Sequence, residues 1–348
     1  MGFVWFWLVA AMLVAYVVLD GFDLGVGILH LFLARNEQER QLMLRTIGPV
    51  WDGNEVWLMA SGGTLYFAFP LLYASAFSGF YLALMIVLWL LIMRGCAIEL
   101  RMQIPMGVWK SFFDGLFFFS SALLAIFFGA ALANVIRGVP IQADGYFFLP
   151  LWTNWQIGVE PGILDWYTVM GGVMAFVALA VHGALYLAVK TEGDLQLRAR
   201  EAGRKLWVVL LLLTIMSLPA SVIARADMLN NYRNYPVLFI VPLMVLLSLL
   251  GIIYFIRKSA DRNAFACSCA YLAIMLVGAA IGLYPRLLPA TTGAANDITV
   301  ENALSGPHTL HVGLIWWSFG MLLAVGYFIF VYRMFRGKVS LDGGGYEH

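Results

Sequence analysis

Long apolar runs constrain this chain more than any other feature of its sequence. Windows of about 20 apolar residues, the length that crosses a bilayer as a helix, recur along the 348 residues. The chain is 62% hydrophobic and 12% charged, whereas soluble domains carry about 25% charged residues. We therefore expect an all-α polytopic membrane protein. Its nine transmembrane helices lie near residues 3–33, 48–70, 73–93, 113–136, 162–189, 206–224, 236–256, 264–285 and 310–332.

The connections between these runs differ in their content of basic residues. One set of alternate connections holds 17 of the 21 Lys and Arg residues, and the other set holds 4. The larger set is Arg35, Arg40, Arg45, Arg94, Arg101, Lys110, Lys190, Arg198, Arg200, Arg204, Lys205, Arg257, Lys258, Arg262, Arg333, Arg336 and Lys338; the smaller is Arg137, Arg225, Arg233 and Arg286. Because cytoplasmic loops carry the excess of Lys and Arg, we expect an outer N-terminus and a cytoplasmic C-terminus.

Two segments that lie four helices apart resemble each other. Residues 24–45 and 181–200 both leave a helix through small residues and then carry a basic residue, an acidic patch and spaced arginines. Such a pattern predicts a parallel repeat, an arrangement known in transporters. The predicted domains are four-helix bundles at 1–137 and 162–285, outer loops at 138–161 and 286–309, and a ninth helix with a tail at 310–348.

Four carboxyl side chains interrupt the first two apolar runs. Asp20 and Asp23 lie in YVVLDGFDLGVGILH, and Asp52 and Glu55 lie in VWDGNEVWLMASGG. Residues three apart share a helix face, and the short connection makes the two helices antiparallel neighbours. From the helix rise, Asp52 lies about 6 Å, Glu55 about 10 Å, Asp23 about 15 Å and Asp20 about 20 Å from the cytoplasmic surface. The acids therefore predict a ladder from that surface to the middle of the bilayer.

Proton handling is the interpretation that this ladder favours. A charged acid at the bilayer centre costs about 2.5–3.5 kcal/mol on insertion scales, and chains of carboxyl groups serve as proton relays in membranes. Neither run contains Lys or Arg, so we expect no salt bridge within this helix pair. Two alternatives stay open, substrate binding and a structural role. In the structural role, Gly21-x-x-x-Gly25 packs helices and Asp52 caps the second helix with help from Asn54.

The histidines do not predict a haem-binding pair. His30 and His182 lie toward the inner ends of the first and fifth runs, whereas His308 and His311 lie at the outer end of the ninth and His348 is terminal. Because these places differ in depth and helix face, we expect ordinary packing roles and no haem ligation.

Cysteines and aromatic residues give weaker predictions. Cys267 and Cys269 diverge by about 200° on a helix, so we expect neither a metal site nor a disulfide framework. The run FFDGLFFFSSALLAIFF, residues 112–128, either lines the tail of a quinone or packs against a neighbouring helix, and both alternatives stay open.

Several motifs in residues 19–101 resemble a known family. The segments LDGFDLGVGIL, GPVWDGNEVWL, FAFPLLYASAFSGFYLAL and RGCAIELR look like subunit II of cytochrome bd-type quinol oxidases, including the cyanide-insensitive branch. The similarity extends over the whole chain in helix number and orientation, and is looser in the C-terminal half. Asp20, Asp23 and Asp52 match the family's motif residues, and Glu55 stands where the family has a polar residue.

The resemblance implies a bacterial inner-membrane complex that oxidises quinol and reduces oxygen to water. Subunit I of such a complex carries haems b and d and the quinol-oxidising loop. Subunit II resembles it in fold, has no haem ligands, packs against it and in some members holds a structural quinone. The acids of its first two helices deliver cytoplasmic protons to the oxygen site. We accordingly expect subunit I, a small single-helix subunit, lipids and quinone as partners, and no nucleic acid.

Two other function classes compete with this one. A proton-coupled secondary transporter would use the same acids near the bilayer middle, although no pair of broken helices stands out. A pure assembly scaffold would tolerate an amide at all four acidic positions.

Overall fold

The computed structural model describes residues 1–340 of the chain. Its helices are α1 (Gly2–Leu33), α2 (Glu37–Ile47), α3 (Trp51–Ala68), α4 (Pro70–Gly79), α5 (Tyr81–Leu100), α6 (Gly107–Arg137), α7 (Trp166–Lys190), α8 (Gly193–Ala224), α9 (Asn230–Asn234), α10 (Ile240–Arg257), α11 (Asp261–Leu283) and α12 (Pro307–Met334). Strands β1 (Arg286–Leu288) and β2 (Ile298–Thr299) form an antiparallel pair. The expected all-α class is confirmed.

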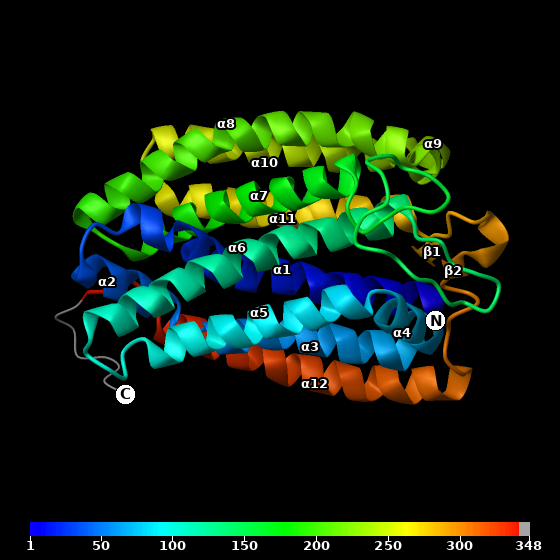
Figure 1. The fold of residues 1–348 in the computed structure, drawn as a ribbon, viewed down its shortest axis with the longest axis horizontal. Coiled ribbons are helices and arrows are strands. Elements are labelled where there is room, and N and C mark those ends of the chain that lie inside the picture. The colour runs from blue at the N-terminus through cyan, green and yellow to red at the C-terminus, as the bar shows by residue number, and fades with distance from the viewer. Residues whose placement is uncertain (341–348) are drawn as a thin grey trace.

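The long helices lie side by side along the longest axis of the molecule (Figure 1). The short helix α2 lies at the end where α12 finishes, and the β1–β2 pair lies at the opposite end near the N-terminus. All the backbone polar groups of a helix are satisfied within it except at its ends, which is why helices can cross the apolar core of a membrane.

Eight helical segments in residues 1–340 are long and apolar enough to cross a membrane: Gly2–Leu33, Tyr81–Leu100, Gly107–Arg137, Trp166–Lys190, Gly193–Ala224, Pro236–Arg257, Asp261–Leu283 and Pro307–Met334. The second predicted run, 48–70, folds as the 18-residue helix α3. This helix is not among the eight, since Asp52, Asn54 and Glu55 lower its apolar content.

Helix α1 lies at the centre of the arrangement and contacts α3, α6, α7 and α11. Its closest approach to α7 is made by glycines, because a Cβ atom on Gly25 would lie 2.7 Å from the Cα atom of Gly183. A Cβ on Gly21 would likewise lie 2.9 Å from Leu179 Cδ2. The predicted packing role of Gly21-x-x-x-Gly25 is thus seen at the α1–α7 contact, and it coexists with the two acids on either side of Gly21.

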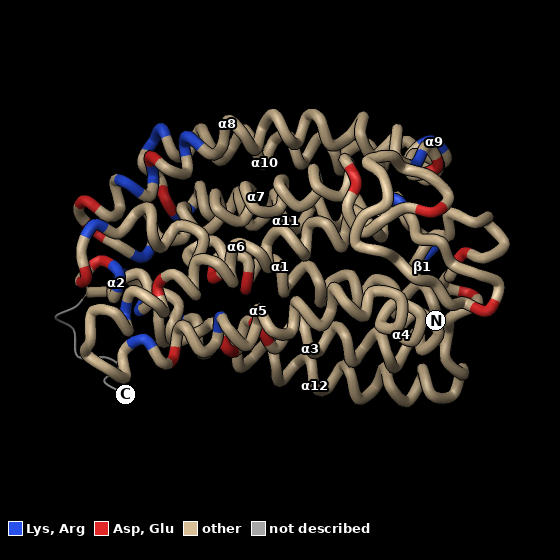
Figure 2. The backbone as a smooth tube through the Cα atoms, in the orientation of Figure 1, with Lys and Arg blue, Asp and Glu red and all other residues tan. Residues whose placement is uncertain are grey.

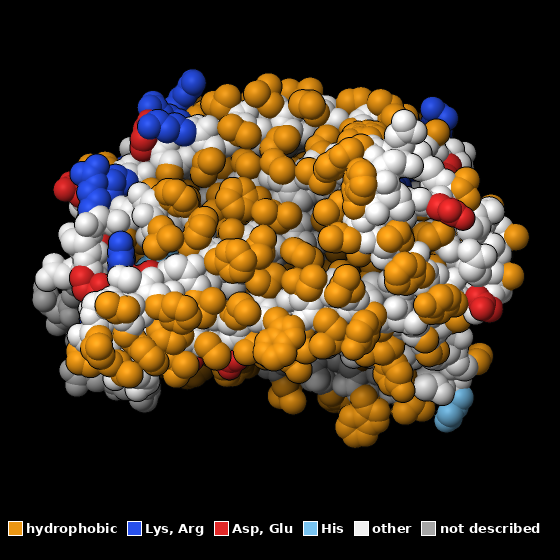
Figure 3. Space-filling view, viewed as in Figure 1, with side chains coloured by type: hydrophobic (Ala, Val, Ile, Leu, Met, Phe, Trp, Pro, Cys, Tyr) orange, Lys and Arg blue, Asp and Glu red, His pale blue; other side chains and the backbone are white. Residues whose placement is uncertain are grey.

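Burial separates a central helix from peripheral ones. In the most apolar 18-residue window of α7, 72% of the residues are buried, whereas none is buried in that of α12. Hydrophobic side chains cover the middle of the face seen in Figure 3, and Lys and Arg gather at the end that carries α2 (Figures 2 and 3). The outer helices therefore present an apolar belt suited to lipid or to another membrane subunit.

Candidate functional site

Two of the predicted acids are fully buried on α1. Asp20 is 0% and Asp23 1% exposed, and both face helices that follow α1 in the chain. Buried carboxyl groups need hydrogen bonds or compensating charge. The structure supplies these to the two acids in different ways.

Asp20 binds an arginine from a third helix. The two terminal nitrogens of Arg94, on α5, donate to the two carboxyl oxygens of Asp20 at 2.9 and 2.7 Å. One of them also donates to a carboxyl oxygen of Glu55, on α3, at 2.9 Å. The fork shape of a guanidinium matches this bidentate geometry, so the three side chains tie α1, α3 and α5 together.

This arrangement corrects one sequence-based expectation. Arg94 was expected in a cytoplasmic connection, but it lies inside α5 and is 0% exposed. The salt bridges of Asp20 and Glu55 are formed with this arginine of a third helix, so they do not contradict the expectation that the first two membrane runs supply no cation of their own. Sequence reasoning considered cations on the first two helices only and therefore missed Arg94.

Asp23 has an uncharged partner instead. Its Oδ2 atom accepts a 2.8 Å hydrogen bond from the side-chain amide of Asn54, and its Oδ1 atom is buried with no hydrogen-bond partner among the described residues. The Asn54 amide nitrogen also donates to the Leu19 carbonyl at 3.2 Å, and its Oδ1 atom accepts from the Tyr332 hydroxyl at 2.8 Å. Without a cation beside it, an ionised Asp23 would be an uncompensated charge in the apolar interior.

The fourth acid lies apart from the other three. Asp52 is exposed in the first turn of α3. The cap residue of this helix is Val50 and there is no side-chain cap hydrogen bond, so the proposed capping role of Asp52 and Asn54 is wrong. The side-chain amide of Asn54 instead forms its hydrogen bonds with α1 and α12.

The connected buried group without Asp52 is referred to by its arginine. We call Asp20, Asp23, Asn54, Glu55, Arg94 and Tyr332 the Arg94 site.

A second ionic group, which sequence reasoning missed, lies nearer the end of the molecule that carries α2. Asp114 on α6 is 1% exposed. It accepts from Arg101 at 2.6 and 3.1 Å and from Arg40 at 2.9 Å, and its Oδ1 atom lies 2.6 Å from His30 Nε2. The only sign of this group in the sequence was Asp114 itself, a single acid within the aromatic run 112–128.

Glu37 on α2 extends this group. It pairs with Arg101 at 2.9 Å and with Lys110 at 3.0 Å. Partial burial opposes its ionisation, but the hydrogen bonds and charges of Arg101 and Lys110 outweigh that effect and hold the pKa of Glu37 below its usual value. We call His30, Glu37, Arg40, Arg101, Lys110 and Asp114 the Asp114 cluster.

Comparison with known proteins places the chain in a family. The family model for cytochrome bd terminal oxidase subunit II matches residues 1–335. The chain belongs to this family. The resemblance found in the sequence motifs is thereby confirmed, and a subunit of this family is part of an oxidoreductase complex of the bacterial inner membrane.

Curated relatives match over nearly their full length. Cytochrome bd ubiquinol oxidase subunit 2 of Bacillus subtilis is 33% identical over 339 residues, covering 97% of this chain and 96% of that protein. Cytochrome bd-I ubiquinol oxidase subunit 2 of Escherichia coli is 33% identical over 337 residues, covering 89% and 87%. The fold also matches a chain of the bd oxidase from Geobacillus thermodenitrificans with a TM-score of 0.75 and 14% identity, covering 96% of this chain and 98% of that one.

The haems of a bd oxidase lie in the partner of this subunit. Residues 1–340 contain no group of three or more His, Cys, Asp or Glu side chains placed to hold a metal ion. Both ring nitrogens of His182 are engaged, Nδ1 with Ser268 at 2.7 Å and Nε2 with the Val18 carbonyl at 3.0 Å. His30 contacts Asp114 as described, and His348 lies outside the described residues.

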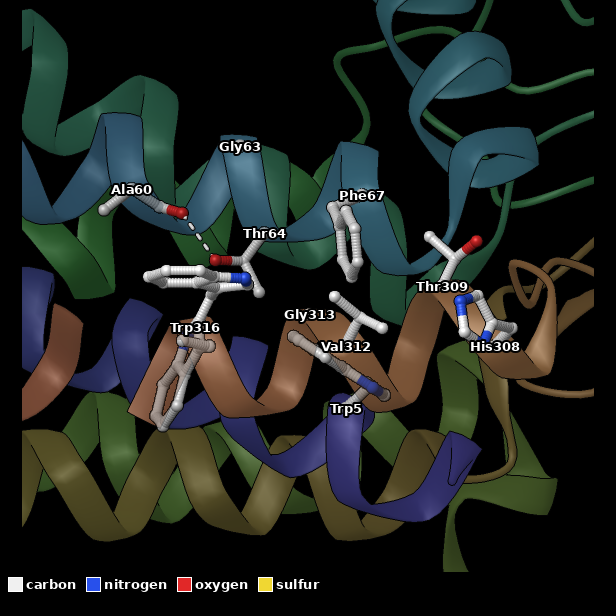
Figure 4. A pocket seen from close by; sticks show the side chains of 11 residues that line it. Trp5, Ala60, Gly63, Thr64, Phe67, His308, Thr309, Val312, Gly313 and Trp316 are labelled. Atoms are coloured by element: carbon white, nitrogen blue, oxygen red, sulfur yellow. Dashed lines mark hydrogen bonds between the residues drawn. The ribbon is translucent and has the colours of Figure 1, made fainter. Parts of the chain in front are cut away.

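A cavity of about 620 Å³ lies between the C-terminal half of α3 and the N-terminal half of α12. Its lining is mainly aromatic and apolar and includes Trp5, Thr64, Phe67, Val312 and Trp316. In Figure 4 the side chains of Trp5, Phe67 and Val312 approach one another from three different helices. None of the acids of the Arg94 site lines this cavity, so its chemistry is separate from theirs.

Proposed function

We propose that this chain supplies cytoplasmic protons to its oxidase complex for the reduction of oxygen to water. The observation that carries the proposal is the carboxyl of Asp23, which is buried and, among the described residues, forms no salt bridge and has one oxygen without a hydrogen-bond partner. A side chain in this state gains or loses a proton without breaking a salt bridge. Intramembrane carboxyls of this kind are typical of proton relays.

The four predicted acids have different parts in the proposed route. Asp52, exposed at the start of α3, and half-buried Glu55 receive protons from the cytoplasm. Asp23 carries them inside the protein. Asp20, held bidentately by Arg94, is a fixed charge at the end of the route that is farthest from the cytoplasm. Protons leave the route near Asp20 and pass to the haem-bearing subunit.

We propose nine membrane-spanning helices with a periplasmic N-terminus. The uneven distribution of Lys and Arg between the two ends of the molecule (Figure 2) supports this orientation. Helix α3 would complete the nine spans, with Asn54 directed to α1 and α12 and Glu55 directed to Arg94 of α5. The close packing of α1 on α7, the first helices of the two proposed four-helix bundles, is compatible with a parallel repeat of residues 1–137 and 162–285.

We also propose that the apolar faces of α5 and α12 support the haem-bearing subunit. Trp89 is 58% and Trp316 73% exposed, and aromatic residues are enriched at protein interfaces. A partner on this face would bury them and would bring the partner close to Glu55, which is 20% exposed. A small single-helix subunit and lipids would cover other parts of the apolar belt.

A structural quinone is our proposal for the cavity between α3 and α12. Its aromatic lining suits a flat ring with an isoprenoid tail. Organic extraction of the purified complex, followed by chromatography, would detect the quinone, and Gly313→Phe should release it, since Gly313 lines the cavity.

Family membership favours an oxidase subunit over the solute transporter that the same acids also allow. The rival that remains is a pure scaffold, for which none of the acids affects turnover. The experiment that separates them uses the complete complex in native membranes, with oxygen uptake measured per haem. We expect Asp23→Asn to lower turnover by about 100-fold or more, the typical scale of a positioned proton-transfer group, with normal haem content.

Asp52→Asn is the companion variant. Because Asp52 is exposed, water can replace part of its role, and we expect a smaller decrease than for Asp23→Asn. Unchanged turnover in both variants, with intact assembly, would establish the scaffold alternative instead.

A further inference from the structure

The ionisable carboxyl of Asp23 does not hold its position alone. Its hydrogen bond comes from Asn54, whose side chain is 0% exposed. Both amide hydrogens of Asn54 are directed at α1, one at Asp23 and one at the Leu19 carbonyl. Because a backbone carbonyl accepts hydrogen bonds and cannot donate one, the contact with Leu19 fixes which end of the amide faces α1.

The other end of the same amide faces α12. With its nitrogen turned to α1, the Oδ1 atom of Asn54 must accept, so the Tyr332 hydroxyl donates to it at 2.8 Å. A donor to the carbonyl oxygen of an amide polarises the group and strengthens its N–H as a donor, which is the cooperativity of hydrogen-bond chains. The hydroxyl of Tyr332 therefore acts on Asp23 through Asn54 although the two do not touch.

Tyr332 is itself fixed by the packing around the end of α12. Its ring stacks on Phe328, with centroids 6.3 Å apart, and the neighbouring Val331 is buried in the core. Beyond the helix end, the Lys190 ammonium donates to the Phe335 carbonyl at 2.7 Å. These contacts tie the last turn of α12 to α7 and leave the hydroxyl of Tyr332 aimed at α3.

We infer that Tyr332 is a positioning residue for proton transfer at Asp23, acting through the side-chain amide of Asn54. The inference rests on the proposed proton route. Without the hydroxyl, the Asn54 oxygen loses its partner and the bond from the amide to Asp23 weakens, although the contact with Leu19 still orients the amide. The carboxyl of Asp23 is then held less firmly and is less polarised on Oδ2.

The experiment compares Tyr332→Phe with two reference variants of the whole complex. Asp23→Asn identifies the carboxyl band of Asp23 in redox-induced infrared difference spectra, by its loss. Tyr327→Phe is the matched control, since Tyr327 is on the same helix but is 58% exposed. In Tyr332→Phe we expect the Asp23 band to move to higher wavenumber and turnover to fall about two- to tenfold, the range that one hydrogen bond supports. Tyr327→Phe should change neither.

Two results would overturn the inference and are distinguishable. If Asp23→Asn slows turnover while Tyr332→Phe leaves both the band and turnover at wild-type values, the role of Tyr332 is wrong and the proton route stands. If Asp23→Asn turns over normally, the proton route itself fails, and the role of Tyr332 fails with it. A decrease of equal size in Tyr327→Phe and Tyr332→Phe would also count against the inference, because it would show a general effect of α12.

Discussion

The Arg94 site and the Asp114 cluster use the same residue types with opposite charge balance. The Arg94 site holds three carboxyls, those of Asp20, Asp23 and Glu55, and one guanidinium, which pairs with Asp20 and Glu55 only. In the Asp114 cluster two carboxyls meet Arg40, Arg101 and Lys110 as well as the ring of His30. An excess of acids leaves one carboxyl without a cation, whereas an excess of cations holds every carboxyl ionised. The first arrangement suits proton exchange and the second suits a fixed connection between helices.

The geometry around each group supports the same distinction. The Asp114 cluster connects α1, α2, α5 and α6 at the end of the molecule that carries α2. Its Glu37 is 46% and its Arg40 31% exposed, so water compensates part of the charge there. The Arg94 site is enclosed, since Arg94, Asp20 and Asn54 are all 0% exposed. A buried ion pair contributes little net stability when complete but is costly to break, so variants of the two groups should differ in both kind and size of effect.

The largest effect is expected from Arg94→Gln. It leaves Asp20 buried without its cation, and breaking a buried pair in this way costs about 3–5 kcal/mol. The yield and melting temperature of the purified complex should fall sharply. Adding Asp20→Asn should restore much of the loss, because the double variant removes the orphaned charge. A complex as stable as wild type in the single variant would contradict the assigned pairing.

Asp114→Asn should sharpen the comparison with Asp23→Asn. The change removes charge-assisted hydrogen bonds, which contribute about 1.5–3 kcal/mol, so we expect a lower melting temperature. Oxygen uptake per assembled haem should stay near wild type, the reverse of the pattern expected for Asp23→Asn. Loss of turnover in an otherwise stable Asp114→Asn complex would show that the cluster also carries protons.

The smallest effect is expected from Glu37→Gln, and it depends on pH. Because the folded-state pKa of Glu37 is lowered, its stabilisation is present above the unfolded-state value of about 4.3 and is lost as pH falls through the folded-state pKa. The side chain is 46% exposed, so solvent screening limits the effect to about 0.2–1 kcal/mol.

Melting temperatures at neutral and acidic pH measure this dependence. The melting temperature of the wild-type complex should exceed that of Glu37→Gln at neutral pH, and this difference should vanish in acid. Glu192→Gln is the control, since Glu192 is 73% exposed and lies 3.6 Å from Lys338. A difference that grows in acid would contradict the assigned direction.

Much of the fold follows from local sequence. Apolar runs of bilayer length predicted eight of the helices that the structure contains, because a membrane leaves the backbone few alternatives to a helix. Boundaries were less accurate where polar residues continue a helix beyond the apolar run. The run at 206–224 is the C-terminal part of α8, which begins at Gly193, and the run at 73–93 is divided between α4 and α5.

The sequence by itself determined that Asp20, Asp23 and Glu55 lie within helices, because apolar runs of bilayer length leave the backbone few alternatives to a helix. Packing decided their burial: Asp20 and Asp23 are buried, whereas Glu55 is 20% exposed and Asp52 is exposed. Only the tertiary structure decided which acid is paired. Arg94 is 74 residues from Asp20 and Tyr332 is 278 residues from Asn54, so no local pattern connects them. The pairing depends on the packing that places α3, α5 and α12 so that Arg94 reaches Asp20 and Tyr332 reaches Asn54. Side-chain charges can compensate one another only after that packing has brought them within hydrogen-bonding distance.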